Sequence, residues 1–363
     1  MPRFPKPRVN GTLWMWGNGA NGRLGMGDTV SHSSPVQVGS LNTWTFVALG
    51  AESTFGIQSN GTLWAWGNNV NGRLGDGTTT SRSSPVQVGS LNTWKMVAPA
   101  EFHTLGIRTD GTLWAWGRGT YGVLGQATNN NSQSSPVQVG SLTTWVNASV
   151  GEQHSHGIRS NSVLFSWGEG ANGRLGGGNQ TDRSSPVQVG TGTIWSLVSG
   201  TNRHSHGLTH DGRLFFWGYN ANGYATSGNG AYNQRSSPVQ VGSLVEWMHV
   251  SNGNGHSHAI RSNGTLWSWG RYYNGSQGTS DNTTRNSPVQ VGSLSTWSDV
   301  SAGKDHSIGL RVDGALFGWG AAGSGQLGQG NTTEFNSPVQ VGSLTTWVQP
   351  AAGGSHSAAL RRG

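Results

Sequence analysis

Histidines recur in this chain at a spacing that could bind a metal ion. Three segments read His-Ser-His, and on a strand the two imidazoles of each pair would share one face, as ligands of zinc or iron can do. The six candidate ligands are His154, His156, His204, His206, His256 and His258. A metal site also needs a third ligand and a supporting carboxylate, and acidic residues are scarce nearby. We therefore favour hydrogen bonding for these histidines and expect no metal.

A histidine also occupies the same place in six successive stretches of the chain. It opens a short run of strand character, which we expect to be the innermost strand of its repeat. The six are His103, His154, His204, His256, His306 and His356, and Ser53 holds the place in the preceding stretch. One polar residue per repeat at a fixed position is typical of side chains that bond to the neighbouring repeat. The pattern predicts structural imidazoles.

Groups that commonly carry catalysis are missing from the sequence. There is no cysteine, so neither a thiolate nucleophile nor a disulfide can form. The phosphate-binding pattern Gly-x-x-x-x-Gly-Lys-Ser/Thr is also absent. The carboxylates Asp110, Asp211 and Asp313 precede glycine in turns, where aspartate is common for backbone reasons. We expect a protein that is not an enzyme and needs no cofactor.

All six tyrosines fall in loops and, with one arginine, are the candidate binding residues. The set is Tyr121; Tyr219, Tyr224 and Tyr232; and Arg271, Tyr272 and Tyr273. In most other repeats the same loop reads Asn-Gly-Arg-Leu-Gly, as at 21–25. Tyrosine and arginine on glycine-rich loops are typical of binding surfaces, because a rigid ring gives contact area at a small entropy cost. The alternative is that these tyrosines fill local gaps where the repeat drifts.

A repeat of about 50 residues must position all of these side chains. The segment Ser-Pro-Val-Gln-Val-Gly occurs seven times, with its proline at Pro35, Pro85, Pro136, Pro186, Pro238, Pro288 and Pro338. Each repeat holds four short runs of strand character, and turns such as 59–61 (Ser-Asn-Gly) suit a tight hairpin between the first two. Four antiparallel strands repeated seven times predict an all-β fold, a seven-bladed β-propeller.

The phase of the repeat indicates how the ring closes. The chain opens on the second strand of a blade, at 11–17, and ends on a first strand, at 355–361. The C-terminal strand would then join three N-terminal strands in one blade, so the ring has no open edge. This assigns residues 10–363 to a single propeller and residues 1–9 to a basic, proline-rich arm outside the repeat.

The 18 tryptophans fall into repeat columns. One column precedes the glycine that ends the second strand: Trp16, Trp66, Trp116, Trp167, Trp217, Trp269 and Trp319. A second column opens the fourth strand, and the remaining tryptophans stand two residues before a member of the first column. Since every tryptophan belongs to a column, the sequence assigns them to a packed core and not to a platform for sugars.

Charge and hydropathy exclude several classes of function. The net charge is +7, but the charges are scattered and form no run of one sign, so we expect no sequence-specific nucleic-acid binding. No apolar stretch is long enough to span a bilayer, and the first residues show no signal peptide. We therefore expect that the chain is made in the cytoplasm and does not insert into a membrane.

Four motifs together cover residues 10–361: Asp/Asn-Gly-x-Leu-Trp/Phe-x-Trp-Gly, Gly-x-Leu-Gly, Pro-Val-x-Val and Gly-x-x-His-Ser-x-x-Leu. They resemble the regulator of chromosome condensation repeat family. The wording Ser-Ser-Pro-Val-Gln-Val-Gly-Ser-Leu is similar to bacterial and bacteriophage members. The resemblance implies the seven-bladed propeller but no single activity, because this fold hosts many. The family's nucleotide-exchange factor has an extra wedge inserted in one blade, and the repeat spacings of this chain leave no room for one.

Three hypotheses of function remain open. The first is a non-enzymatic protein-interaction or structural module, such as a capsid- or tail-associated virion subunit of a bacteriophage. The second is a lectin-like or protein-inhibitor module that binds a surface glycan or a protein with loops of the fifth and sixth repeats. Inhibitors of lactam-cleaving enzymes in this family set a precedent for the protein case. The third, ranked last, is a GTPase- or chromatin-linked regulator.

Overall fold

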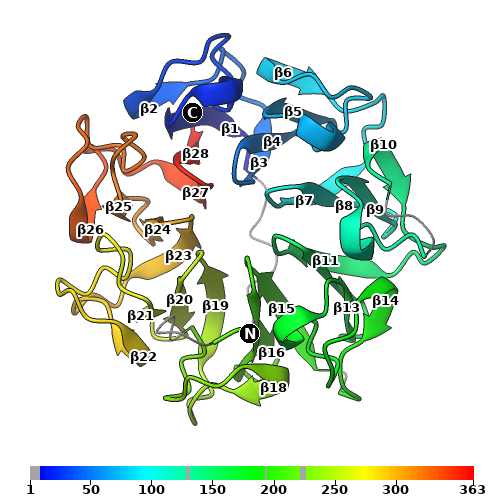
Figure 1. The fold of residues 1–363 in the computed structure, drawn as a ribbon. Helices are drawn as coiled ribbons and strands as arrows, with labels where there is room; N and C mark the ends of the chain where they lie inside the picture. Colours follow the sequence, from blue (N-terminus) through cyan, green and yellow to red (C-terminus); the bar gives the residue numbers. More distant parts are fainter. Residues whose placement is uncertain (1–8, 128–130, 193, 221–225) are drawn as a thin grey trace.

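The described residues of the computed structural model form a ring of seven four-stranded blades (Figure 1). They are residues 9–127, 131–192, 194–220 and 226–363, so most of the predicted N-terminal arm lies outside them. The all-β, seven-bladed propeller with antiparallel blades is confirmed. Among the described residues, no helix is long and apolar enough to cross a membrane.

Each blade runs from an innermost strand near the axis to an outermost strand at the rim (Figure 1). In that order, blade 1 has β27 (Trp347–Ala352), β28 (His356–Arg362), β1 (Gly11–Gly17) and β2 (His32–Gln37). Blade 2 has β3 (Trp44–Leu49), β4 (Ser53–Gln58), β5 (Leu63–Gly67) and β6 (Arg82–Gln87). Blade 3 has β7 (Trp94–Pro99), β8 (His103–Arg108), β9 (Leu113–Gly117) and β10 (Gln133–Gln138). Blade 4 has β11 (Trp145–Val150), β12 (His154–Arg159), β13 (Leu164–Gly168) and β14 (Arg183–Gln188).

The remaining blades follow the same order. Blade 5 has β15 (Trp195–Gly200), β16 (His204–Thr209), β17 (Leu214–Gly218) and β18 (Arg235–Gln240). Blade 6 has β19 (Trp247–Asn252), β20 (His256–Arg261), β21 (Leu266–Gly270) and β22 (Arg285–Gln290). Blade 7 has β23 (Trp297–Ala302), β24 (His306–Arg311), β25 (Leu316–Gly320) and β26 (Phe335–Gln340). Short 3₁₀ turns lie in the loops of blades 1 to 4, at η1 (Ala20–Gly22), η2 (Val70–Gly72), η3 (Thr120–Gly122) and η4 (Ala171–Gly173).

The strand at the axis differs from the one expected. The innermost strand of each blade is the one that begins with tryptophan, and the strand that begins with histidine is the second. The reason is local: a short turn at 50–52 folds β3 directly onto β4, while residues 38–43 cross from the outermost strand of blade 1 to the innermost strand of blade 2. The run that we placed last in each repeat therefore opens the next blade.

The same shift changes how the ring is closed. Strands from the two ends of the chain do share one blade, and Figure 1 shows the red β27 and β28 beside the blue β1 and β2. The division is two strands from each end, however, and not one C-terminal with three N-terminal strands. Residues Gly11 to Gly17 pair in register with Arg362 to His356, so the seam runs along a complete strand.

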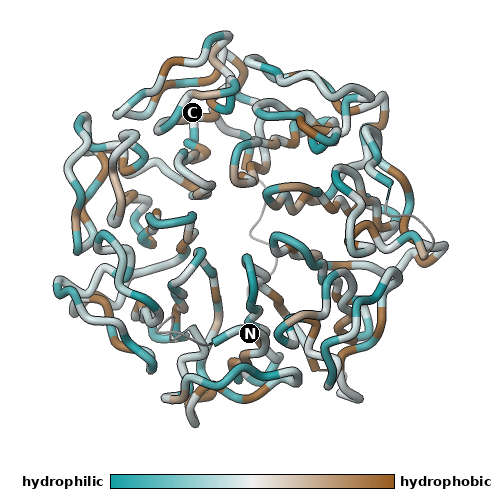
Figure 2. Tube along the Cα trace, viewed as in Figure 1, coloured by the Kyte–Doolittle hydropathy of each residue, from teal (hydrophilic) through white to brown (hydrophobic). Residues whose placement is uncertain are grey.

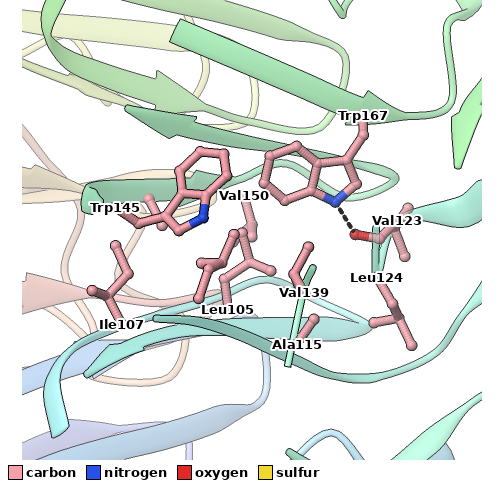
Figure 3. Close-up of a cluster of buried hydrophobic side chains, with 11 residues drawn as sticks. Leu105, Ile107, Ala115, Val123, Leu124, Val139, Trp145, Val150 and Trp167 are labelled. Atoms are coloured by element: carbon pink, nitrogen blue, oxygen red, sulfur yellow. Dashed lines mark hydrogen bonds between the residues drawn. The ribbon is translucent and has the colours of Figure 1, made fainter. Parts of the chain in front are cut away.

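The core lies in the gaps between neighbouring blades, and hydrophobic residues recur around the whole ring (Figure 2). In the gap between blades 3 and 4, Trp145 and Trp167 of blade 4 pack over aliphatic side chains of blade 3 (Figure 3). The Trp167 indole N–H donates to Val123 O at 2.8 Å. Gly125 has a φ of +70°, and a Cβ there would lie 2.9 Å from Trp167 Nε1, so the close approach needs glycine.

The tryptophans of the first sequence column are fully buried, with exposures of 0%. They are Trp16, Trp66, Trp116, Trp167, Trp217, Trp269 and Trp319. Those that open the innermost strands are also buried, and the third group, which includes Trp14, is partly exposed. Burying an aromatic side chain stabilises a fold by about 2–3 kcal/mol, so these columns supply much of the force that holds blade to blade.

A proline lies in the outermost strand of each blade. In blade 2 it is Pro85, at a bulge where the register slips between Ala65 and Gly67 of β5. Proline has no N–H to donate and is tolerated on edge strands and at bulges. The repeated Ser-Pro-Val-Gln segment is thus the sequence of an edge strand.

Candidate binding face

The ring has two faces, and the tyrosine loops lie on one of them. In blade 2 the turn between β3 and β4 lies beside the loop that follows β5, because Asn68 N donates to Glu52 O at 2.9 Å. We call this end of the ring the loop face. The other end carries the β4–β5 hairpin and the segment crossing between blades, where Ser59 N donates to Thr43 O at 2.8 Å. We call it the hairpin face.

Blades 5 and 6 present two arginine–tyrosine pairs on the loop face. Tyr219 follows β17; its N–H donates to Arg203 O at 2.9 Å, and the Arg203 guanidinium carbon lies 5.7 Å from the centre of the Tyr219 ring. Arg271 follows β21; its N–H donates to Gly255 O at 2.7 Å, and its guanidinium carbon lies 5.7 Å from the centre of the Tyr273 ring. Cation–π contacts of this kind restrict flexible arginine side chains. Adjacent blades therefore present pre-positioned cations and rings.

Exposure separates the tyrosines of these two blades. Tyr232 and Tyr273 are 48% and 45% exposed. Tyr219 and Tyr272 are half-buried. A half-buried ring can serve either as local packing or as the floor of a contact surface. Tyr232 and Tyr273 leave more of their rings accessible to a partner.

The other candidate tyrosines are spread over the ring. Tyr232 lies near the outer edge, because Gly230 donates its N–H to Asn286 O of β22 at 2.8 Å. Tyr121 is 40% exposed on blade 3, two blades away from blade 5. Its φ is 60°, the left-handed region that asparagine occupies in η1, η2 and η4. Tyr224 lies outside the described residues.

Sequence reasoning missed a charge difference across the loop face. Glu52, Glu101 and Glu152 lie on the turns before the second strands of blades 2, 3 and 4, whereas the same turn in blade 5 carries Arg203. Burial, and then the negative charge of Glu101, raise the pKa of Glu152 above its ordinary value. The signal was present in the sequence, in the one or two residues before each first-position histidine. It becomes meaningful only once those turns are known to form one ring.

Five of the six first-position histidines join neighbouring blades by hydrogen bonds, and the sixth, His204, contacts Thr201 of its own turn. His103 Nε2 lies 2.8 Å from Ser155 Oγ of the next blade, and the Ser155 hydroxyl donates to Val123 O at 2.8 Å. The hydroxyl therefore accepts from the imidazole, which places the imidazole proton on Nε2. Equivalent contacts join His154 to Ser205, His256 to Ser307, His306 to Ser357 and His356 to Thr54. We call this set the polar belt.

The second histidines of the His-Ser-His segments lie in the same layer. His156 contacts Ser166 Oγ through Nδ1 at 2.6 Å and Ser205 Oγ through Nε2 at 2.7 Å. In blade 5 the residue matching Ser166 is Phe216, whose ring centre lies 5.3 Å from that of His206. Among the described residues, no group of three or more histidines and carboxylates is placed to hold a metal ion.

Burial keeps the imidazoles of this layer neutral. It lowers the pKa to about 3 in His103, His156, His206, His256 and His306. In His154, His204, His258 and His356 the pKa is also lowered well below its ordinary value, again mainly by burial. A neutral histidine that is fully buried between blades can hold the ring together but cannot exchange protons with a bound molecule near pH 7.

Most of the chain matches the repeats of one protein family. The model described as the regulator of chromosome condensation (RCC1) repeat matches residues 10–57, 60–107, 110–158, 162–207, 263–310 and 313–360, and a second RCC1 repeat model matches 297–326. The stretch between 207 and 263 falls between matches, and it carries Tyr219, Tyr224 and Tyr232. No curated protein matches the chain.

Solved structures of similar fold cover nearly the whole ring. Human WBSCR16 is 20% identical with a TM-score of 0.86, and the match covers 98% of this chain and 99% of that one. Yeast RCC1 (Prp20), bound to Kap60, is 20% identical with a TM-score of 0.85, covering 98% and 90%. Prp20p from Saccharomyces cerevisiae, in a study of its binding to Gsp1p and histones, is 20% identical with a TM-score of 0.82, covering 98% and 92%. At this identity the likeness concerns the fold.

Proposed function

Because the chain belongs to the regulator of chromosome condensation (RCC1) repeat family, we propose that it is a non-enzymatic protein-binding module that holds its partner with the loop face of blades 5 and 6. The observation that carries the proposal is the pair of arginine–tyrosine stacks on adjacent blades. Tyrosine and arginine dominate the energetics of many protein interfaces. Tyr219 lies in the stretch that the family repeat does not match, whereas Arg203, Arg271 and Tyr273 lie in matched repeats, so the first stack combines a repeat position with a residue outside the matched repeats.

Charge indicates which side of a partner would face this surface. Arg203 and Arg271 lie beside the tyrosines, while Glu52 and Glu101 lie on blades 2 and 3, away from them. Glu152, on blade 4, lies near enough to Arg203 for their charges to interact. Complementary potentials orient a partner and exclude the reversed orientation. We therefore expect an acidic contact surface on the partner at blades 5 and 6.

Replacing two exposed tyrosines of blades 5 and 6 together (Tyr232→Ser and Tyr273→Ser) is expected to abolish partner capture in a pull-down while shifting the melting temperature little. Both rings are about half exposed, so their loss removes contact area from an interface and little from the core. The matched control is Tyr121→Asn, which restores the residue found at this left-handed position in other repeats. If the double variant captures the same partners as wild type, the site is elsewhere; a large fall in melting temperature would make these rings structural.

Our preferred partner is a protein of an assembled particle, which would make this chain a capsid- or tail-associated bacteriophage protein. The support is the wording of the repeats, which is similar to bacterial and bacteriophage members. Co-sedimentation of the chain with purified virions tests this part alone. Recovery only as free protein in a phage lysate would contradict it while leaving the loop face as a protein-binding surface.

A lectin-like module is the second candidate, and the exposed tyrosines favour it because aromatic rings also bind sugars by stacking. A glycan array separates the two candidates. We expect wild type and the variant Tyr232→Ser with Tyr273→Ser to give the same glycan-binding pattern; a glycan bound by wild type and lost in the variant would favour the lectin. A GTPase- or chromatin-linked role ranks third. Yeast Prp20p was studied with Gsp1p and histones, but the near-constant repeat length of this chain leaves no room for a wedge.

A further inference from the structure

The hairpin face carries at least one exposed aliphatic side chain in each segment that crosses between blades. In six of these segments it is the leucine that follows Val-Gln-Val-Gly-Ser, with exposures from 38% to 48%. These are Leu41, Leu91, Leu142, Leu244, Leu294 and Leu344. In the segment that enters blade 5, Ile194 is 40% exposed. Single exposed leucines are ordinary, but a leucine at the same place in six crossing segments, with Ile194 two positions later in the seventh, makes a ring of exposed aliphatic side chains, which is typical of an interaction surface.

A second ring, of arginines, accompanies the leucines. Arg108, at the end of β8, lies with its guanidinium carbon 5.6 Å from the centre of the Trp114 ring, and its Nε donates to Thr93 Oγ1 at 2.7 Å. Thr93 follows Leu91 by two residues, so the cation is fixed beside the leucine. The same stacking occurs for Arg159, Arg213, Arg261, Arg311 and Arg361. Arginines held in place lose little freedom on binding.

Carboxylates of the same chain pair with several of these arginines. Arg213 pairs with Asp211 at 2.8 Å and Arg311 with Asp313 at 3.2 Å, and Arg261 pairs with Glu246. A membrane of anionic lipid or an anionic polymer would meet these carboxylates with like charge. A surface whose charges are largely paired in place and which carries an apolar ring can meet its own copy without leaving an unpaired charge, because a twofold rotation sets the leucines of one copy against those of the other.

Ion pairs of both signs also occur on the loop face, such as Arg23 with Glu52, but the exposed leucines of the described residues all lie on the hairpin face. The outer edge strands carry a proline at a bulge, and the loop face carries the tyrosines that we assign to another partner. We propose that the hairpin face is the interface between two copies of this chain, related by a twofold axis. The dimer turns both loop faces outward, so two partner sites point in opposite directions. It therefore binds a partner with repeated sites more tightly than one ring does.

The test is the mass of the purified chain in solution, measured by light scattering and sedimentation equilibrium at micromolar concentration. We expect wild type at twice 38.2 kDa and the variant Leu91→Glu, Leu142→Glu, Leu294→Glu at 38.2 kDa. The matched control places the same charge on exposed valines of the loop face, as Val30→Glu with Val70→Glu, and should remain a dimer. Circular dichroism and melting establish that each variant is folded. If the triple variant fails to fold, Leu294→Glu alone should raise the dissociation constant of the dimer at least tenfold.

Several outcomes would overturn the proposal. A monomeric wild type at about 100 µM would do so, since a specific interface of standard size is populated at that concentration. So would a dimer that survives the leucine variant and is lost in the valine control. Binding of a monomer to vesicles containing phosphatidylserine, or to heparin, and its loss in the leucine variant, would assign the face to a lipid or a polyanion. The variant Tyr232→Ser with Tyr273→Ser should stay dimeric, so failure of the dimer is distinct from failure of the proposed function.

Discussion

Deletion of residues 354–363 is expected to abolish cooperative unfolding of the ring, or to lower its free energy of unfolding by at least several kcal/mol. The segment contains β28, which lies inside blade 1 and pairs with β27 on one side and with β1 on the other. Residues His356 to Leu360 are buried. Without them, β1 and β2 form an isolated hairpin, which is marginal in water, and the belt contact from His356 to Thr54 is lost.

Thermal and urea unfolding followed by tryptophan fluorescence measure this effect. The control is removal of Arg362 and Gly363 alone, which are exposed and end the strand, and it should leave the melting temperature nearly unchanged. A typical domain has a free energy of unfolding of about 5–15 kcal/mol, so the larger deletion should remove a large part of it. An unchanged melting temperature after that deletion would show that the seam between the chain ends does not hold the ring.

Acidification is expected to destabilise the ring steeply below about pH 6.5. The nine buried histidines have pKa values far below the ordinary 6.5, to about 3 in five of them. Between these values the unfolded chain binds protons that the folded chain cannot, so the stability present above pH 6.5 is lost as the pH falls toward 3. A single histidine contributes about 1.4 kcal/mol per pH unit in this range, and nine buried sites act in the same direction, so we expect the free energy of unfolding to fall much more steeply with pH than one site would cause.

The atoms explain why the folded chain cannot take up these protons. In His103, His306 and His356 the Nε2 atom meets a hydroxyl of the next blade, while the buried Nδ1 atom finds no hydrogen-bond partner among the described residues. A second proton would have to sit on Nδ1 as a charge without a partner. Serine naturally holds this position in blade 2, at Ser53, so serine is the matched substitution.

Urea unfolding at pH 7.5, 6.5 and 5.5 gives the free energy of unfolding at each pH, and its slope against pH gives the number of protons that the chain takes up on unfolding. The triple variant of His103, His306 and His356 to serine should reduce the dependence of unfolding free energy on pH by about one third, because it removes three of the nine buried sites. The control His210→Ser removes an exposed histidine of the hairpin face, outside the buried set, and so measures the effect of removing a histidine that does not join two blades. Equal pH dependence in wild type and the triple variant would show that the belt is not the group that titrates.

Much of the fold could be predicted because the same turn residues and the same buried aromatic positions recur in seven repeats. Turn residues such as those at 59–61 identify hairpins, and aromatic columns such as Trp66 and Trp94 identify the faces that pack between blades. Periodicity cannot show where a blade begins, however, since a repeat reads the same from any starting strand. The choice is made by the turn at 50–52, and for that reason we assigned both the innermost strand and the division of the closing blade wrongly.

The candidate site was harder to predict than the fold. Tyr219 and Tyr273 could be singled out because they break the pattern of their column, yet their stacking partners depend on which loops share a face. Arg203 lies 16 residues before Tyr219 and belongs to another turn, so no local pattern connects them. The arginines of the hairpin face follow the repeat and so attracted no notice as a binding feature. The pull-down and the mass measurement decide whether each set binds a partner.

The proline in each outermost strand has a consequence for the protein in crowded solution. A propeller of seven blades exposes seven strand edges, and a repeated sequence could make all of them equivalent templates for an incoming extended segment. A proline such as Pro85 removes a donor from that template, and the bulge beside it bends the strand away from the flat geometry that stacking requires. The repeat that creates seven exposed strand edges therefore also places a proline in each of them, which opposes pairing with another chain. We infer that such chains can be packed at high local concentration without converting into fibrils.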